Sequence, residues 1–318
     1  MVISASARIA ASACLFLLAS AAFADEPVLS VTPQPAPVIT SYDGFVSIAG
    51  GGLQTRFYNG GQDDTGTYIE GAARIALPLA GPYTLQADLT LSDGTISNQN
   101  SSYNSSLIRR SLEGTAHLFW RDPAFASFGV LVQYADDTLS EKSSVNNFSY
   151  DIPAALMSAG IEGQYFIGNS TLYFQLAYER ITVDLSSTFD YHSNGAVLGS
   201  EFRTFFQPNL MTTLRAGYEF NRVSYFGFAL DSSVKSVGAG IEYAPEHYPV
   251  SFFGSIDGLQ QSYDTPWSSG EFEETVRALV GIKYNFGGKS LFERDRNGAS
   301  MTPLRPHRPL LGFIIPAG

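Results

Sequence analysis

The chain has 318 residues, a formal net charge of −11, and only 15% charged residues against 13% aromatic residues. The acidic balance disfavours binding to nucleic acid, and no stretch reaches the roughly 18 apolar residues that a membrane-spanning helix needs. The one cysteine, Cys14, leaves the chain without an internal disulfide.

Residues 1–24 have the pattern of a secretory signal peptide. Arg8 precedes an apolar segment over 9–19, and Ala22-Phe23-Ala24 forms an A-x-A site, so we expect cleavage before Asp25. Residues 25–41 contain four prolines and are typical of an extended periplasmic lead-in without a core of its own.

Twelve later segments alternate apolar and polar residues with a period of two. The clearest is 83–91, where every second residue is apolar, because side chains on a strand point to opposite faces in turn. Most segments have the nine to eleven residues that a tilted strand needs to cross a bilayer. The predicted strands are 44–54, 68–77, 83–91, 110–120, 125–135, 155–167, 171–182, 197–206, 210–221, 234–243, 250–260 and 274–286.

The connections between these strands alternate in length. The short ones, such as 168–169 and 207–209, carry turn residues, and the long ones, such as 92–109 and 136–154, are rich in Ser, Asn, Asp and Gly. This alternation predicts a transmembrane antiparallel up-and-down β-barrel of about 12 strands over 42–286, with short periplasmic turns, long external loops and both termini in the periplasm. A soluble β-sandwich is the alternative, but it would not need every second connection to be short.

The inward faces of the predicted strands are polar and mixed in charge. The candidate lumen-lining residues are Arg74, Asp88, Glu113, His117, Glu162, Glu179, Glu201, Arg203, Arg215, Glu219, Asp257, Arg277 and Lys283. Opposite positions in a hairpin sum to a constant, which predicts the cross-strand pairs Arg74 with Asp88, Glu201 with Arg215, Arg203 with Thr213, and Glu162 with Gln175.

Two interpretations of these charges remain open. One is a porin-like passive channel for small hydrophilic solutes, with a mild cation preference because carboxylates outnumber basic groups. The other is a non-conducting barrel, closed by ion pairs, that acts as a structural or interaction protein through its loops and tail.

A lipid-modifying enzyme is a third possibility, which we do not favour. Outer-membrane phospholipases, similar to this chain in strand number, need a His and a Ser two residues apart on a lipid-facing strand. Leu118 and Phe119 follow His117 instead. A hairpin centred on Asp122 would place His117 opposite Ser127, without an acid to orient the histidine. We expect no catalytic residues, cofactor or metal, since no oxygen-ligand spacing for calcium is present.

Segment 274–286 resembles the C-terminal insertion signal of outer-membrane barrels, with alternating apolar residues and a final aromatic, Phe286. The resemblance implies recognition by the barrel-assembly machinery. Residues 287–318 follow, with five basic and two acidic residues, 5 − 2 = +3. They include GGKSLFERDRNGAS, which is similar to the polar periplasmic extension of some alphaproteobacterial outer-membrane barrel proteins of uncertain function.

Three possibilities remain for this basic tail: a disordered extension, a contact with peptidoglycan or a periplasmic partner, or docking into the acidic lower mouth of the barrel. The sequence as a whole predicts a location in the outer membrane of a Gram-negative bacterium. The expected partners there are lipid and lipopolysaccharide, with no nucleic acid.

Overall fold

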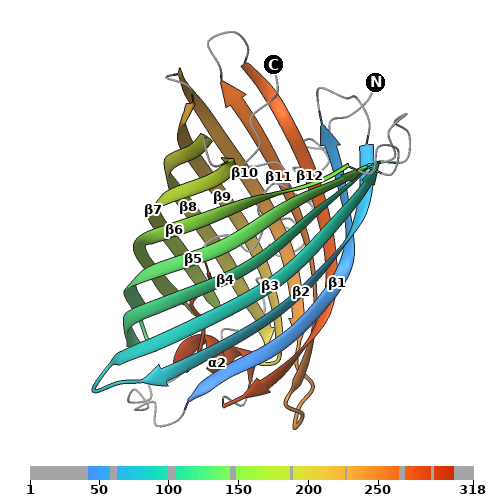
Figure 1. Ribbon diagram of the computed structural model, residues 1–318. Helices are drawn as coiled ribbons and strands as arrows, with labels where there is room; N and C mark the ends of the chain where they lie inside the picture. The colour runs from blue at the N-terminus through green and yellow to red at the C-terminus, as the bar shows by residue number, and fades with distance from the viewer. Residues whose placement is uncertain are drawn as a thin grey trace.

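The computed structural model describes residues 42–57, 63–98, 105–143, 148–186, 189–225, 228–264, 269–287 and 290–303. They form one closed barrel, in which every strand pairs antiparallel with its neighbours in chain order and β1 pairs with β12 (Figure 1). The predicted fold class is therefore confirmed. The expected signal peptide and lead-in lie outside the described residues.

The twelve strands have between 15 and 20 residues each. They are β1 (Asp43–Phe57), β2 (Asp63–Pro78), β3 (Tyr83–Asn98), β4 (Ser105–Asp122), β5 (Ala126–Ser143), β6 (Phe148–Ile167), β7 (Ser170–Ser186), β8 (Phe189–Gln207), β9 (Leu210–Tyr225), β10 (Phe228–Tyr243), β11 (Val250–Asp264) and β12 (Ser269–Phe286).

The two ends of the barrel differ. We call the end that holds the connections 79–82, 123–125, 168–169, 208–209 and 244–249 the turn end, and the opposite end the loop end. At the turn end the strands stop within one or two residues of the predicted positions. Turn residues explain this accuracy: Gly81 and Gly168 have φ angles of 66° and 53°, which glycine adopts without strain.

At the loop end the strands run further than the sequence pattern indicates. For example, β3 continues to Asn98 and β4 begins at Ser105, so most of the loop expected over 92–109 is strand. The reason is that the outward positions there are polar, as at Asp93, Thr95 and Ser97, which removes the apolar outward face while the backbone ladder continues. Since about 9–11 residues suffice to cross a bilayer, the strands extend beyond it.

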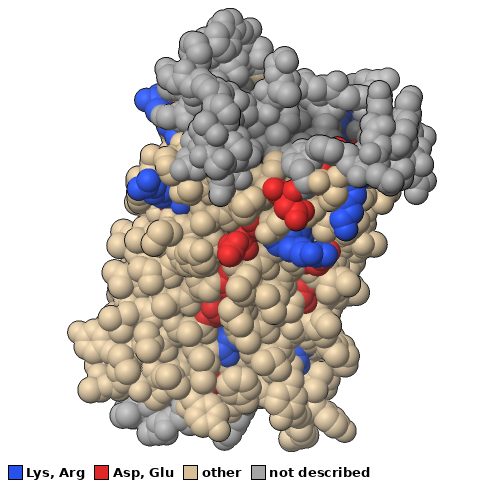
Figure 2. All heavy atoms as spheres, in the orientation of Figure 1, with Lys and Arg blue, Asp and Glu red and all other residues tan. Residues whose placement is uncertain are grey.

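The outer surface carries an apolar belt. Leu89, Leu91, Val130 and Val132 are among the large apolar side chains that point outward and are exposed. Toward the loop end the outward positions become charged, as at the exposed ion pair between Arg110 and Asp93 (3.1 Å). Figure 2 shows most of the lower half of this face as uncharged, with charged side chains gathered nearer the loop end. The belt has the apolar, uncharged surface that lipid requires.

One short helix, α2 (Leu291–Asn297), follows the barrel and lies at the turn end (Figure 1). Among the described residues, no helix is long and apolar enough to cross a membrane.

Candidate functional site: the lumen and its C-terminal plug

The thirteen candidate lumen residues all lie at inward-facing strand positions. Their side chains are buried or half-buried, whereas the residues beside them in sequence belong mostly to the exposed outer face. The predicted register is confirmed at each hairpin tested: Arg74 with Asp88, Glu201 with Arg215, Arg203 with Thr213, and Glu162 with Gln175.

Backbone register does not decide every ion pair. Arg74 does pair with Asp88, but Glu201 pairs with Arg203 on its own strand rather than with Arg215 opposite. Arg215 instead reaches Asp257 at 2.8 Å. Arginine side chains are long enough to reach diagonal and same-face neighbours, so the alignment of opposite charges was an incomplete guide.

The expected contact between His117 and Ser127 is wrong. The hairpin is centred on Ala124, because Asp122 pairs with Ala126, and this places Arg121 opposite Ser127. His117 is fully buried, with Nδ1 2.9 Å from Glu162 and Nε2 3.0 Å from Asp88. Both ring nitrogens of His117 therefore face a carboxylate oxygen, so the imidazole lies between two acidic side chains of the wall.

The largest feature missed by the sequence analysis is the plug segment, residues 290–303, which docks inside the turn end. Its helix begins at Ser290, whose Oγ accepts a hydrogen bond from the Glu293 amide (3.1 Å), and ends at Gly298. Of the three possibilities for the tail, these described residues adopt the docked one. Residues 304–318 lie outside the described residues.

Three wall strands bind the stretch that follows α2. Arg121 on β4 donates to the carbonyl of Gly298 and to Ser300 Oγ, both at 2.6 Å. Gln86 on β3 makes two hydrogen bonds with the Met301 backbone, at 2.8 and 3.1 Å. On β6, Gln164 donates to the Ser300 carbonyl (3.1 Å). These wall side chains therefore satisfy backbone groups that would otherwise be buried without partners.

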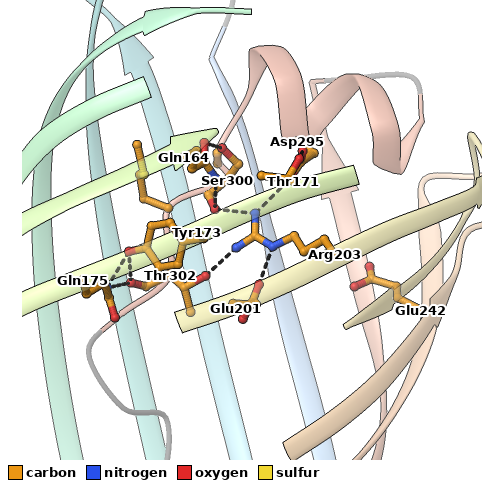
Figure 3. A network of polar contacts seen from close by, with 12 residues as sticks. Gln164, Thr171, Tyr173, Gln175, Glu201, Arg203, Glu242, Asp295, Ser300 and Thr302 are labelled. Carbon is orange, nitrogen blue, oxygen red and sulfur yellow. Dashed lines mark hydrogen bonds and ion pairs between the residues drawn. The ribbon is translucent and has the colours of Figure 1, made fainter. Parts of the chain in front are cut away.

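Arg203 on β8 is the centre of the largest polar network (Figure 3). Its guanidinium contacts Asp295 at 2.7 Å, the Ser300 carbonyl at 2.8 Å and Thr302 Oγ1 at 2.6 Å, in addition to Glu201. All of Arg203, Glu201 and Asp295 are at least nine-tenths buried. The plug thus supplies a carboxylate that balances a wall cation inside the lumen.

Strand β7 makes a ladder of contacts with the plug. Thr171 donates to Asp295 at 2.5 Å, and Tyr173 and Gln175 donate to the Thr302 carbonyl at 2.8 and 2.5 Å (Figure 3). The three wall residues are successive inward positions of one strand. The plug therefore rises along β7 from the turn end into the lumen.

The plug also fits sterically against the start of β1. The Ala299 amide donates to Asp43 Oδ2 at 2.9 Å, and Arg294 donates to the Gly44 carbonyl at 2.7 Å. A Cβ atom built on Gly298 would lie 1.6 Å from Asp43 Oδ2. Any side chain at position 298 would therefore displace either the Asp43 carboxylate, which accepts the Ala299 amide hydrogen bond, or the plug itself.

Arg296 fixes α2 to the turn between β6 and β7. Its Nη2 atom donates to the carbonyls of Gly168 and Ser170, each at 2.9 Å, and its guanidinium lies 4.2 Å from the ring centre of Phe166. Burial lowers the pKa of Arg296, and neighbouring Asp295 opposes that shift. The plug also makes apolar contacts with the wall: Met301 is fully buried against Phe119 and Tyr173.

A cavity of about 260 Å³ lies between the plug and the β1–β3 and β8–β12 side of the wall. At about 30 Å³ per water, it has room for roughly nine waters. Its charged lining is balanced, with six basic and six acidic side chains: Arg74, Arg203, Arg215, Arg277, Lys283 and Arg294, against Asp43, Glu70, Asp88, Glu201, Glu242 and Asp295.

The loop-end half of the lumen is different. Among the described residues of this half, six buried inward-facing residues are acidic and one, Arg109, is basic. An apolar cluster of Leu53, Tyr68, Ile96 and Leu279 with Ala49 also lies on that side. The acidic set is Asp64, Glu113, Asp137, Glu179, Glu219 and Glu273. In the part of the chain that is described, no group of His, Cys, Asp and Glu is suited to hold a metal ion.

Comparison with known proteins finds similarity in structure alone. No protein-family model matches the chain, and no curated protein matches it. The translocator domain of the autotransporter NalP from Neisseria meningitidis has a TM-score of 0.50 and 15% identity, covering 87% of this chain and 98% of that one. The β domain of the Bordetella autotransporter BrkA has a TM-score of 0.52 and 11% identity, covering 77% and 100%.

The Pseudomonas putida toluene transporter TodX is also among the matches, with a TM-score of 0.44 and 10% identity over 84% of this chain and 93% of that one. These identities establish the fold alone. The closed barrel, its apolar belt and the two autotransporter domains show that the chain has the fold of a transmembrane β-barrel of the outer-membrane type. Nothing in the matches supports the resemblance to alphaproteobacterial proteins.

Proposed function

We propose that the protein is a porin-like passive channel for small hydrophilic solutes, held closed at its turn end by the plug segment. The observation that carries this proposal is a polar lumen whose cavity is bounded by a segment that packs non-covalently. Among the described residues, the polar contacts of the plug with the wall are side-chain hydrogen bonds and ion pairs together with one backbone hydrogen bond, from the Phe292 amide to the Pro208 carbonyl (3.0 Å), so the plug can leave without unfolding the barrel. The proposal assigns no catalytic step.

A mild cation preference follows from the loop-end half of the lumen. There the described buried inward-facing charges are six carboxylates and one guanidinium, Arg109, whereas the lining of the cavity beside the plug is balanced. A cation entering from the loop end meets an attractive potential before it reaches the balanced region. We therefore place selectivity in the loop-end half rather than at Asp88 and Asp257, which are both neutralised by arginines.

The main rival is a non-conducting barrel, and the density of plug contacts favours it. Met301 is fully buried, and strands β3, β4, β6, β7 and β8 all bind the plug. If those contacts never open, the lumen serves only to anchor the tail.

Conductance of the full-length protein in planar bilayers separates the two. Gly298→Val should displace the plug, because its Cβ would lie against Asp43, and should convert rare small openings into frequent large ones. Gly270→Val is the matched control, since a Cβ there meets nothing within 4 Å. If folded Gly298→Val protein conducts no better than Gly270→Val, the channel proposal fails and the non-conducting barrel stands.

A further inference from the structure

We propose that the cavity beside the plug is a binding site for a small organic anion, a carboxylate attached to an apolar group. Its volume of about 260 Å³ lies just below the roughly 300–1,000 Å³ of pockets for drug-sized ligands, so it suits a smaller molecule. This inference goes beyond the proposed function. It concerns the turn end, whereas the cation preference concerns the loop-end half, and it does not depend on whether the barrel conducts.

The charged lining of this cavity is balanced in number but not in exposure. Four of its basic side chains are partly exposed, namely Arg215 at 26%, Lys283 at 20%, and Arg74 and Arg294 at 12% each. Of the six acidic side chains described there, Glu70 is comparably exposed, at 19%, and the other five are at most 9% exposed. A ligand in the cavity therefore meets more positive than negative charge.

The hydrogen-bonding capacity of the lining is unbalanced in the same direction. Asp88, Glu242 and Asp295 each have both carboxylate oxygens engaged by side chains of the wall. Arg215, in contrast, makes its hydrogen bond among the described residues from Nη2 alone, to Asp257 at 2.8 Å. Because a guanidinium carries five N–H donors and no acceptor, Arg215 keeps donors for a ligand. A negatively charged ligand with oxygen acceptors matches this surplus of donors.

Aromatic rings lie beside the exposed cations. The Arg74 guanidinium is 5.1 Å and the Lys283 ammonium 5.0 Å from the ring centre of Phe45, so cations from β2 and β12 approach the same ring. The Lys283 ammonium is also 4.9 Å from the ring centre of Phe253. Both rings line the cavity, which thus offers apolar surface next to positive charge. An organic anion can use both features, whereas an inorganic anion can use only the charge.

Arg215 is the cation that best tests the site. Arg203 is committed to Glu201 and the plug, so its replacement would disturb the fold. Arg215 shares Asp257 with Arg277, which lies 3.2 Å from that carboxylate. When Arg215 is replaced, Asp257 therefore keeps a cation, and a loss of ligand binding can be separated from a loss of stability.

Equilibrium dialysis of the folded full-length protein against labelled benzoate tests the proposal, with benzamide as the neutral ligand of similar shape. We expect benzoate to bind at least about tenfold more tightly than benzamide, because charge-assisted hydrogen bonds are the stronger ones. Arg215→Gln should weaken benzoate binding at least about tenfold for the same reason. Arg222→Gln is the matched control on the same strand. Arg222 is 63% exposed and pairs with Asp231 at 2.8 Å, so its replacement should leave benzoate binding unchanged.

Gly240→Leu tests the place of binding without changing any charge. Gly240 lines the cavity, and a Cβ atom there would have its nearest neighbour, the Gly254 carbonyl oxygen, at 3.4 Å. The leucine side chain should therefore occupy the cavity and exclude benzoate. The proposal is overturned if the wild-type protein binds no benzoate, if benzamide binds as tightly, or if either Arg215→Gln or Gly240→Leu keeps wild-type affinity. Failure of the channel proposal would show in conductance and leave these affinities intact, so the two ideas fail separately.

Discussion

The two halves of the lumen handle buried charge in different ways. At the turn end, six basic and six acidic side chains line the cavity, and the plug supplies part of this balance, since its Asp295 pairs with Arg203. In the loop-end half the described buried inward-facing charge is acidic apart from Arg109. The comparison teaches that the C-terminal plug is part of the charge balance at the turn end, because its Asp295 pairs with Arg203 of the wall.

The buried network around Arg203 should give the largest effect. Arg203→Met leaves Glu201 buried without its cation and leaves Asp295 with only the more distant Arg296, at 3.8 Å. Breaking a buried pair in this way typically removes about 3–5 kcal/mol. Urea unfolding in lipid vesicles, followed by tryptophan fluorescence, measures the loss. Adding Glu201→Gln to Arg203→Met should recover part of it, because Glu201 is then no longer a buried charge without its cation, while Asp295 stays charged beside Arg296.

Arg110→Met is the matched control for that network. The Arg110 and Asp93 side chains are 66% and 47% exposed, and exposed pairs contribute less than about 1 kcal/mol. Equal losses for Arg203→Met and Arg110→Met would remove the distinction between the paired interior and the solvated rim.

Arg121 should affect the plug more than the wall. Arg121→Met removes two hydrogen bonds to Gly298 and Ser300, and hydrogen bonds from charged donors contribute about 1.5–3 kcal/mol each. Hydrogen exchange of the plug amides should accelerate accordingly, while exchange in the wall strands changes little.

Arg109→Met is the variant in the loop-end half that is compared with Arg121→Met. Arg109 is equally buried and binds Asp137 at 2.8 Å, but it lies in the other half of the lumen. Its removal should loosen the neighbouring ends of β4 and β5 and leave exchange in the plug unchanged. Faster plug exchange in Arg109→Met would mean that the two halves are one cooperative unit.

The sequence predicts the wall better than the interior, for physical reasons. Alternation and turn residues are local, so they fix strand parity and even the pairing of Glu162 with Gln175. Alternation does not predict the extensions of the strands at the loop end, because the outward positions there are polar. The contact of Gln86 with Met301 joins residues 215 apart, and no periodicity reports such a distance. One local pattern in the sequence of the plug does indicate its helix: Ser290-x-x-Glu293 is a capping pattern for the start of α2.

The acidic loop-end half should give the smallest effect, a change in ion selectivity. Glu113→Gln with Glu219→Gln, introduced into the conducting Gly298→Val protein, removes two of the buried inward-facing carboxylates. We expect the preference for potassium over chloride to fall by less than about twofold, or ~0.4 kcal/mol, because the remaining carboxylates stay in place. The reversal potential in a salt gradient measures the change.

Glu246→Gln provides the control for this last comparison. Glu246 is an exposed residue of the 244–249 connection at the turn end, where its charge is screened by solvent and salt, so its neutralisation should leave the reversal potential unchanged. Selectivity that responds to Glu246 and not to Glu113 and Glu219 would place the discriminating charge at the turn-end mouth.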